Sequence, residues 1–154
     1  MDSYRNAVDR SLAVLFADAG EDFSLDENGM TSIALENNIT ITLELGGNED
    51  RLYIRVPLLS LAPSQTEFLK TALETNLFSM PSDQTWIAYD RDIAALVLCG
   101  ALGDEARDPE SLRAILESVA IDATQAGRAL NGARTGNANE ESLLTDVSSF
   151  KVQG

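Results

Sequence analysis

The stretch PSQTEFLKTALETNLFSM, residues 63–80, decides the fold, because it predicts one helix around which the rest of the chain can be placed. Ser64 followed three residues later by Glu67 is the pattern of a capping box, in which both side chains bond amides at the start of a helix. Pro81 and Ser82 predict the end of the helix. One wide apolar stripe at three- and four-residue spacings is predicted from Phe68, Leu69, Ala72, Leu73 and Leu77, with Phe78 and Met80 beside it.

Three strands are predicted on the N-terminal side of this helix. Apolar and polar residues alternate over 30–36, 39–45 and 51–58, which is typical of strands with one buried face. Asn37-Asn38 predicts a tight turn between the first two strands because asparagine tolerates positive φ, and residues 46–50 predict a looser turn. Links this short favour an antiparallel meander.

A hairpin is predicted on the C-terminal side of the helix, from strands at 85–89 and 93–101 with a turn at 90–92. In the run IAALVLC, residues 93–99, both alternating sets of side chains are apolar, so neither face of this strand favours water. One face can lie on the chain's own helices. We expect a second copy of the same chain to cover the other face.

Two further helices are predicted near the ends of the chain. Residues 3–18 predict the first, which Asp2 or Ser3 can cap. The sequence Asp108-Pro109-Glu110 predicts the start of the last helix, and Asn131-Gly132 predicts its end. The complete order, α-β-β-β-α-β-β-α, predicts an α+β fold with helices packed on a twisted antiparallel sheet.

The chain divides into one domain and a tail. Residues 1–131 hold all the predicted strands and helices named so far, and residues 132–139 are rich in Gly, Asn, Ala and Thr, which is typical of a linker. Residues 132–154 are therefore expected to be a flexible linker and C-terminal tail. The end of the tail places Leu143, Leu144, Val147 and Phe150 at helical spacing, a pattern that fits either a docking helix or a disordered segment.

The central stretch also carries a resemblance to a known family. The run LLSLAPSQTEFLKTALETNLF, residues 58–78, follows the strand RLYIRVP and precedes the strand pair around Trp86 and Val97. In this order and spacing the chain resembles the class I chaperones of bacterial type III secretion systems, the Tir chaperone-like family. The resemblance covers roughly the first 130 residues, and its order of elements is the fold of those chaperones.

Charge and hydropathy exclude several classes of function. The chain has 25 acidic and 11 basic residues and a net charge of −14, so it lacks the basic stripe that a nucleic-acid partner requires. No apolar run approaches the roughly 20 residues that cross a bilayer, and the first ten residues predict no secretory signal. We expect a cytoplasmic bacterial protein without membrane insertion, whose acidic surface favours a basic or polar protein partner.

Catalytic chemistry finds little support in the sequence. The chain has no histidine, and its one cysteine, Cys99, lies in an apolar run where a buried thiol is expected. The serines Ser60, Ser64 and Ser79 therefore have no histidine to activate them. Acidic pairs lie in predicted turns or at helix ends, and Asp26-Glu27-Asn28-Gly29 lacks the alternating ligands of a calcium loop. We expect no enzyme activity, no cofactor and no metal.

The resemblance implies a homodimer that holds the N-terminal segment of a secreted effector in extended form and keeps it soluble. Strand addition at the edge of the meander would supply main-chain hydrogen bonds, and apolar side chains would supply anchors. The effector-binding candidates are Leu12, Phe16, Phe23, Leu25, Ile33 and Leu35. The dimer-interface candidates are Leu73, Leu77, Trp86, Leu96 and Leu98. Each of these apolar residues also fits an ordinary position in the core.

Two other classes of function remain open from the sequence. The first is an interaction module of the same fold with no secretion role. The second is an acidic inhibitor that mimics nucleic acid or blocks a basic enzyme, which the net charge allows. Salt separates the inhibitor from an apolar binder, because only the inhibitor would lose affinity steeply as ionic strength rises.

Overall fold

The computed structural model describes residues 3–20, 22–48, 50–62, 65, 67–78 and 84–134. Within these residues the predicted order of elements, and with it the α+β class, is confirmed. The helices are α1 (Tyr4–Leu15), α2 (Glu67–Phe78) and α3 (Pro109–Arg134), and the short 3-10 helices are η1 (Ala17–Ala19) and η2 (Asp104–Arg107). The strands are β1 (Met30–Ala34), β2 (Thr40–Leu45), β3 (Leu52–Ser60), β4 (Thr85–Asp90) and β5 (Ala95–Leu102).

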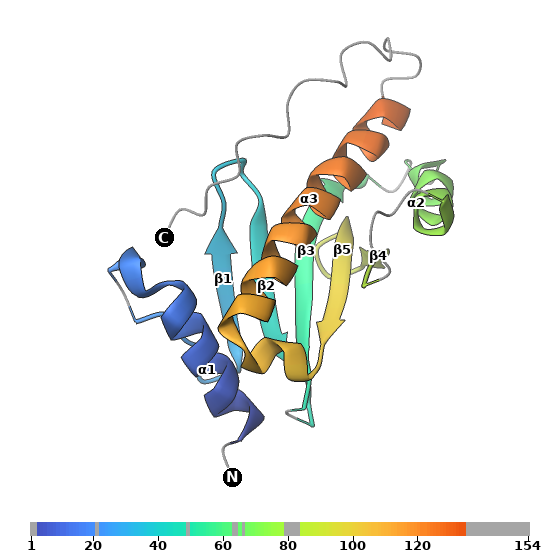
Figure 1. Ribbon diagram of the computed structural model, residues 1–154. Helices are drawn as coiled ribbons and strands as arrows, with labels where there is room; N and C mark the ends of the chain where they lie inside the picture. The colour runs from blue at the N-terminus through green and yellow to red at the C-terminus, as the bar shows by residue number, and fades with distance from the viewer. Residues whose placement is uncertain are drawn as a thin grey trace.

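The five strands form one antiparallel sheet in the order β1-β2-β3-β5-β4. The predicted meander of the first three strands is confirmed, and the later hairpin joins it through β5. Figure 1 shows α3 crossing one face of the sheet, with α1 beside β1 and α2 beside β4 at the opposite side. The strands at the two edges of the sheet are therefore β1 and β4.

The core lies between the sheet and the helices α1 and α3. Leu52, Ile54 and Val56 of β3 are buried, whereas Tyr53 is exposed and Arg55 is half-buried on the other face. This alternation confirms the prediction of one buried face over this stretch, because successive side chains of a strand point to opposite faces. The pairing of β3 with β5 shifts between Pro57 and Leu59, where the strict alternation ends.

The burial of the strand β5 differs from the prediction that a second copy of the chain covers one of its faces. Ala95, Leu96, Val97 and Leu98 are at most 3% exposed within a single chain. The expectation that one face of this strand needs a second copy is therefore wrong for these four residues. On one face of the sheet, Leu96 and Leu98 belong to the hydrophobic core cluster. On the other face, the cross-strand neighbours of Val97 are Pro57 of β3 and Ala88 of β4, because β5 lies between these two strands.

The helix α2 begins at Glu67, later than predicted, and its apolar residues divide between two faces. Phe68 and Ala72 are buried in the core. The second face carries Leu69, Leu73 and Leu77, which are 36%, 68% and 71% exposed and which we name the α2 stripe. The expected cap Ser64 and the residues Met80, Pro81 and Ser82 lie outside the described residues.

A side chain of α2 closes the outer edge of β4. The Asn76 Oδ1 atom accepts a hydrogen bond from the Ile87 amide at 2.6 Å, and the Asn76 amide nitrogen donates to the Ile87 carbonyl at 3.0 Å. Asn76 thus bonds both backbone groups of Ile87, as a neighbouring strand would. This clamp prevents another chain from pairing with β4 at that point.

The ends of the other helices follow the predicted caps. Ser3 caps α1 by accepting from the Asn6 amide, while Asp2 lies outside the described residues. Asp108 precedes α3 and accepts from the amide and hydroxyl of Ser111, and these hydrogen bonds lower the pKa of its carboxyl group. The helix α3 continues to Arg134, past the predicted end at Asn131-Gly132.

The turn between β1 and β2 has three residues rather than two. The Leu35 amide donates to the Ile39 carbonyl at 2.8 Å, so residues 36–38 form the loop. Asn38 has a φ of 59°, the left-handed conformation that asparagine tolerates better than most residues.

The clamp predicts the effect of removing the Asn76 side chain. Asn76→Ala leaves the amide and carbonyl of Ile87 without these partners, and we expect it to lower the free energy of unfolding by about 1–3 kcal/mol. Urea denaturation followed by circular dichroism measures this loss. The control Glu74→Ala removes an exposed ion pair with Lys70 and should cost less than about 0.5 kcal/mol. Equal losses in the two variants would contradict the clamp.

Candidate functional site

The open edge of the sheet lies on β1. Because Leu35 bonds Ile39, the alternation of antiparallel pairing directs the amides and carbonyls of Ser32 and Ala34 away from β2. Within the described part of the chain, no strand pairs with this side of β1. An edge of this kind accepts an added strand.

Asp26 closes the same edge one step earlier, at Met30. The Asp26 Oδ1 atom accepts from the Met30 amide at 2.9 Å, and the Asp26 amide donates to the Met30 carbonyl at 2.8 Å. The open part of the edge therefore begins beyond Met30, at Ser32. We name the outward backbone groups of Ser32 and Ala34 the open edge.

The helix α1 holds Asp26 in this place. The Arg5 guanidinium donates to the carbonyls of Leu25 and Asp26, and the Asp9 carboxylate accepts from the Leu25 amide at 2.8 Å. The connector between η1 and β1 is thus tied to α1 by two side chains one helical turn apart. Its position sets where the open edge starts.

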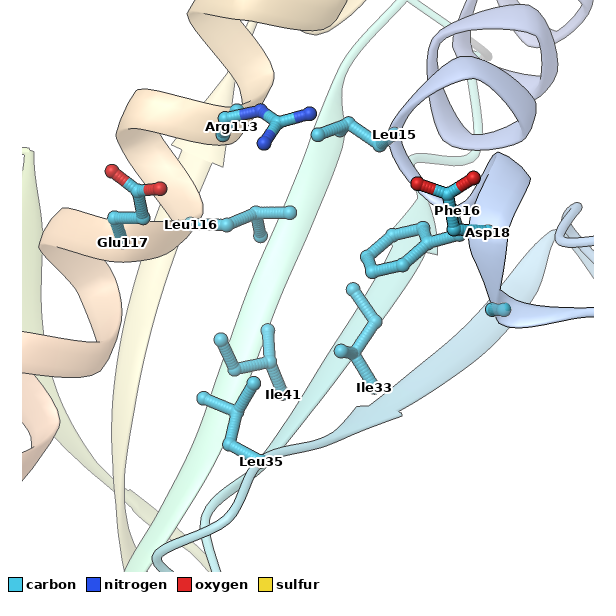
Figure 2. Close-up of a pocket in the computed structure, with 10 residues that line it drawn as sticks. Leu15, Phe16, Asp18, Ile33, Leu35, Ile41, Arg113, Leu116 and Glu117 are labelled. Carbon is cyan, nitrogen blue, oxygen red and sulfur yellow. The ribbon is translucent and has the colours of Figure 1, made fainter. Parts of the chain in front are cut away.

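An apolar pocket lies next to the open edge, between the end of α1, the strands β1 and β2, and the helix α3 (Figure 2). Its volume is about 280 Å³. Since a dry cavity of roughly 150 Å³ holds a benzene molecule, the pocket has room for one or two apolar side chains. The lining residues are Leu15, Phe16, Asp18, Ala19, Ile33, Leu35, Ile41, Arg113, Leu116 and Glu117.

The polar residues of the pocket stand at its mouth. Asp18, Arg113 and Glu117 are exposed, whereas the residues contributed by the strands are buried. Figure 2 shows the Arg113 side chain reaching from α3 toward Leu15 of α1. Arg113 forms no ion pair with any residue that the structure describes, unlike Arg55, which contacts Glu44 and Asp90 on the opposite face of the sheet.

Pocket and open edge are parts of one surface. Ile33 lines the pocket, and it stands in β1 between Ser32 and Ala34, whose backbone groups face outward. A chain paired with this edge would direct alternate side chains toward the pocket side of the sheet. The arrangement can therefore hold an extended polypeptide by its backbone and by one or two apolar side chains.

The predicted effector-binding residues divide into two groups. Phe16, Ile33 and Leu35 line the pocket. Leu12 and Leu25 are buried in the core away from it, and Phe23 is half-buried with its ring 4.5 Å from that of Phe16.

Sequence reasoning missed several residues of the pocket. Leu15 and Leu116 lie within the two helices predicted near the ends of the chain, and a helical pattern does not show that these helices meet above β1 and β2. The rim combines two polar residues of α3, Arg113 and Glu117, with Asp18 of η1, and exposed polar residues on a helix do not by themselves indicate a pocket. The missed lining residues are Leu15, Asp18, Ala19, Ile41, Arg113, Leu116 and Glu117.

The predicted dimer-interface residues are also divided. Leu73 and Leu77 belong to the exposed α2 stripe, and Trp86 of β4 is 43% exposed. Leu96 and Leu98 are 1% exposed inside the same chain and offer no area to a partner. Since α2 packs against β4, the α2 stripe and Trp86 lie on neighbouring elements.

No group of three or more Cys, Asp or Glu side chains among the described residues is placed to hold a metal ion. None of the described helices combines the length and the apolar character that crossing a bilayer demands. Cys99 is half-buried, and burial raises the pKa of its thiol.

Comparison with known proteins identifies a family. The sequence model of the Tir chaperone protein (CesT) family matches residues 10–126 of this chain. Among curated proteins, none matches the sequence.

Three solved structures share the fold. A chain of the ExsC-ExsE complex is 21% identical with a TM-score of 0.66, and the match covers 84% of this chain and 97% of that one. A chain of the HopA1-SchA chaperone-effector complex is 14% identical with a TM-score of 0.63, covering 83% and 98%. A chain of the heterodimeric ExoU-SpcU complex from the type III secretion system of Pseudomonas aeruginosa is 16% identical with a TM-score of 0.57, covering 79% and 95%.

Proposed function

The chain belongs to the Tir chaperone protein (CesT) family, and we propose that it is a type III secretion chaperone that holds the N-terminal segment of a secreted effector in extended form. The family match confirms the resemblance drawn from the sequence. The effector, called the client below, is kept soluble and ready for secretion. The structures of related fold include a chaperone-effector complex, which supports an effector as the partner.

One observation carries this proposal: the open edge of β1 lies beside the apolar pocket. The backbone of the client pairs with the amides and carbonyls of Ser32 and Ala34, which requires no particular client sequence. One or two apolar side chains of the client then enter the pocket. The pocket, formed in part by Phe16, Ile33 and Leu35, supplies the selectivity.

Typical magnitudes show which contact matters more. A backbone hydrogen bond contributes about 0.5–1.5 kcal/mol net, because it replaces a bond to water. Burial of one Leu, Ile or Phe side chain contributes about 1.5–3 kcal/mol. One anchor in the pocket therefore contributes more than one backbone bond, and only the anchors depend on the client sequence, whereas the open edge fixes the direction and register of the client.

We further propose a homodimer whose interface includes the α2 stripe and Trp86. Leu73 and Leu77 are about 70% exposed, which is unusual for leucines repeated on one helix face. Because α2 contacts β4, the exposed apolar surface can extend from these leucines to Trp86. Leu96 and Leu98 are left out because the single chain buries them. The proposed interface then lies at the β4 edge of the sheet, whereas the pocket lies toward the β1 edge; Figure 1 shows these two strands at opposite edges.

The proposed chaperone acts by binding alone, in the bacterial cytoplasm, without catalysis. Its net charge of −14 keeps the complex soluble while the apolar surfaces are occupied. An acidic inhibitor of nucleic-acid enzymes remains the alternative, and it would use the charge without the pocket.

A substitution that fills the pocket tests the anchor site. The client is first recovered by co-purification from the native host and identified, and its N-terminal segment is titrated by calorimetry. Ala19→Phe places a ring in the pocket, and we expect it to weaken client binding roughly 10- to 100-fold, the cost of expelling one apolar anchor. The control Ala13→Phe makes the same change on an exposed part of α1. Unaltered affinity in Ala19→Phe would remove the pocket from the client site.

Amide hydrogen exchange tests strand addition at the open edge. The amides of Ser32 and Ala34 face outward, whereas that of Ile33 faces β2 and serves as an internal control. On binding of the client segment, we expect exchange at Ser32 and Ala34 to slow at least roughly tenfold, because new backbone bonds protect them. Little change is expected at Ile33. Unchanged exchange at both outward amides would rule out pairing with β1.

The dimer is tested by placing a charge in the α2 stripe. Leu77→Asp buries a carboxylate in the proposed interface, and we expect monomers in analytical ultracentrifugation at micromolar concentration. The control Val14→Asp alters an equally exposed apolar residue, 60% exposed, on α1. A wild-type chain that is monomeric under the same conditions, or a Leu77→Asp chain that stays dimeric, would contradict this interface.

A further inference from the structure

The pocket has a chemical match within the same chain. It is apolar, with Arg113, Asp18 and Glu117 at its mouth, and the C-terminal residues 140–150 read EESLLTDVSSF. Leu143, Leu144, Val147 and Phe150 recur there at helical spacing, among three carboxylates. These residues lie outside the described part of the structure, so the match rests on their sequence.

We propose that residues 140–150 occupy the pocket of the same chain when no client is bound, and that the client displaces them. The inference rests on the proposed function, because it assigns a second occupant to the client's pocket. It makes the segment an internal competitor, which shields the pocket between clients. Polypeptides whose apolar segments bind the pocket only weakly would not displace this segment and would be excluded from the pocket.

The length of the tail supports this occupant. The helix α3 carries the pocket residue Leu116 and ends at Arg134, 18 residues later. This distance is about 27 Å at roughly 1.5 Å per helical residue. The eight residues 135–142 span about 26 Å when extended at roughly 3.3 Å each, which brings Leu143 back to the level of Leu116. Leu143 is also the first large apolar residue after α3.

The mouth carries one cation, Arg113, and the carboxylates of Asp18 and Glu117. Charge therefore favours a segment that brings a carboxylate to Arg113 and keeps its other carboxylates away from the two acids. Arg113 stands at the mouth and forms no ion pair with a described residue, although the chain carries a net charge of −14. The carboxylates of Glu140, Glu141 and Asp146 flank the apolar residues that would enter the pocket. A bound segment would thus give Arg113 an acidic neighbour close to buried apolar side chains.

Tethering makes weak docking sufficient. A segment joined by a short flexible linker has an effective concentration of about 1 mM or more at its site. Docking with an intrinsic dissociation constant in the millimolar range would then fill the pocket for a large fraction of the time. A client of micromolar affinity still displaces the segment, at an apparent affinity lowered roughly two- to tenfold.

A spin label tests the contact directly in the full chain. A nitroxide is attached at Ser149→Cys in a Cys99→Ala background, and methyl NMR signals are compared before and after reduction of the label. We expect selective broadening of Ile33, Ile41 and Leu116, the methyls of the pocket. The methyls of Leu73 and Leu77 on α2 are the control. Equal broadening at pocket and control methyls, or none at the pocket, would overturn the proposal.

Two further samples complete the test. Leu144→Asp with Val147→Asp in the labelled chain should abolish the broadening and raise the client affinity roughly two- to tenfold. Broadening that arises only between a labelled chain and a separate isotope-enriched chain would contradict docking within one chain. The client titration of Ala19→Phe stands apart from these results, so failure of the tail contact and failure of the pocket as a client site are distinguishable.

Discussion

A strand at the edge of a sheet carries amides and carbonyls that no neighbour bonds, and the rest of this structure depends on how its two edges are treated. At β4 the Asn76 side chain bonds both backbone groups of Ile87 and closes the edge at that residue. At β1 the backbone and side chain of Asp26 do the same at Met30, and the closure stops there. Beyond Met30, the outward backbone groups of Ser32 and Ala34 have no strand partner among the described residues.

The pocket gives the open edge its selectivity. Hydrogen bonds to a backbone are made by any extended chain, so an edge alone would be a site of indiscriminate association. Here the end of α1 and the first half of α3 stand on either side of an apolar hollow above β1 and β2. Only a chain with apolar side chains at suitable positions gains the binding free energy of the pocket in addition to that of the edge. The fold therefore combines an unselective contact with a selective one.

Local patterns predicted the elements of this fold but not their neighbours. The alternation over 51–58 predicted the inward face of β3, and Phe16, Ile33 and Leu35 were named for the client site because they are apolar on adjacent elements. The burial of Leu96 and Leu98 was misjudged, since an apolar run on both faces fits a central strand as well as an interface. Which of these holds depends on strand order, and strand order depends on contacts between residues far apart in the chain. The rim residue Arg113 and the clamp residue Asn76 are single polar side chains whose roles exist only in three dimensions.

The most direct test of the central claim is a crystal structure of this chain with the N-terminal segment of its client. The account predicts an extended client segment paired with β1 through Ser32 and Ala34, with an apolar side chain among Phe16, Ile33 and Leu116. A client bound elsewhere, with β1 unpaired and the pocket empty, would contradict it.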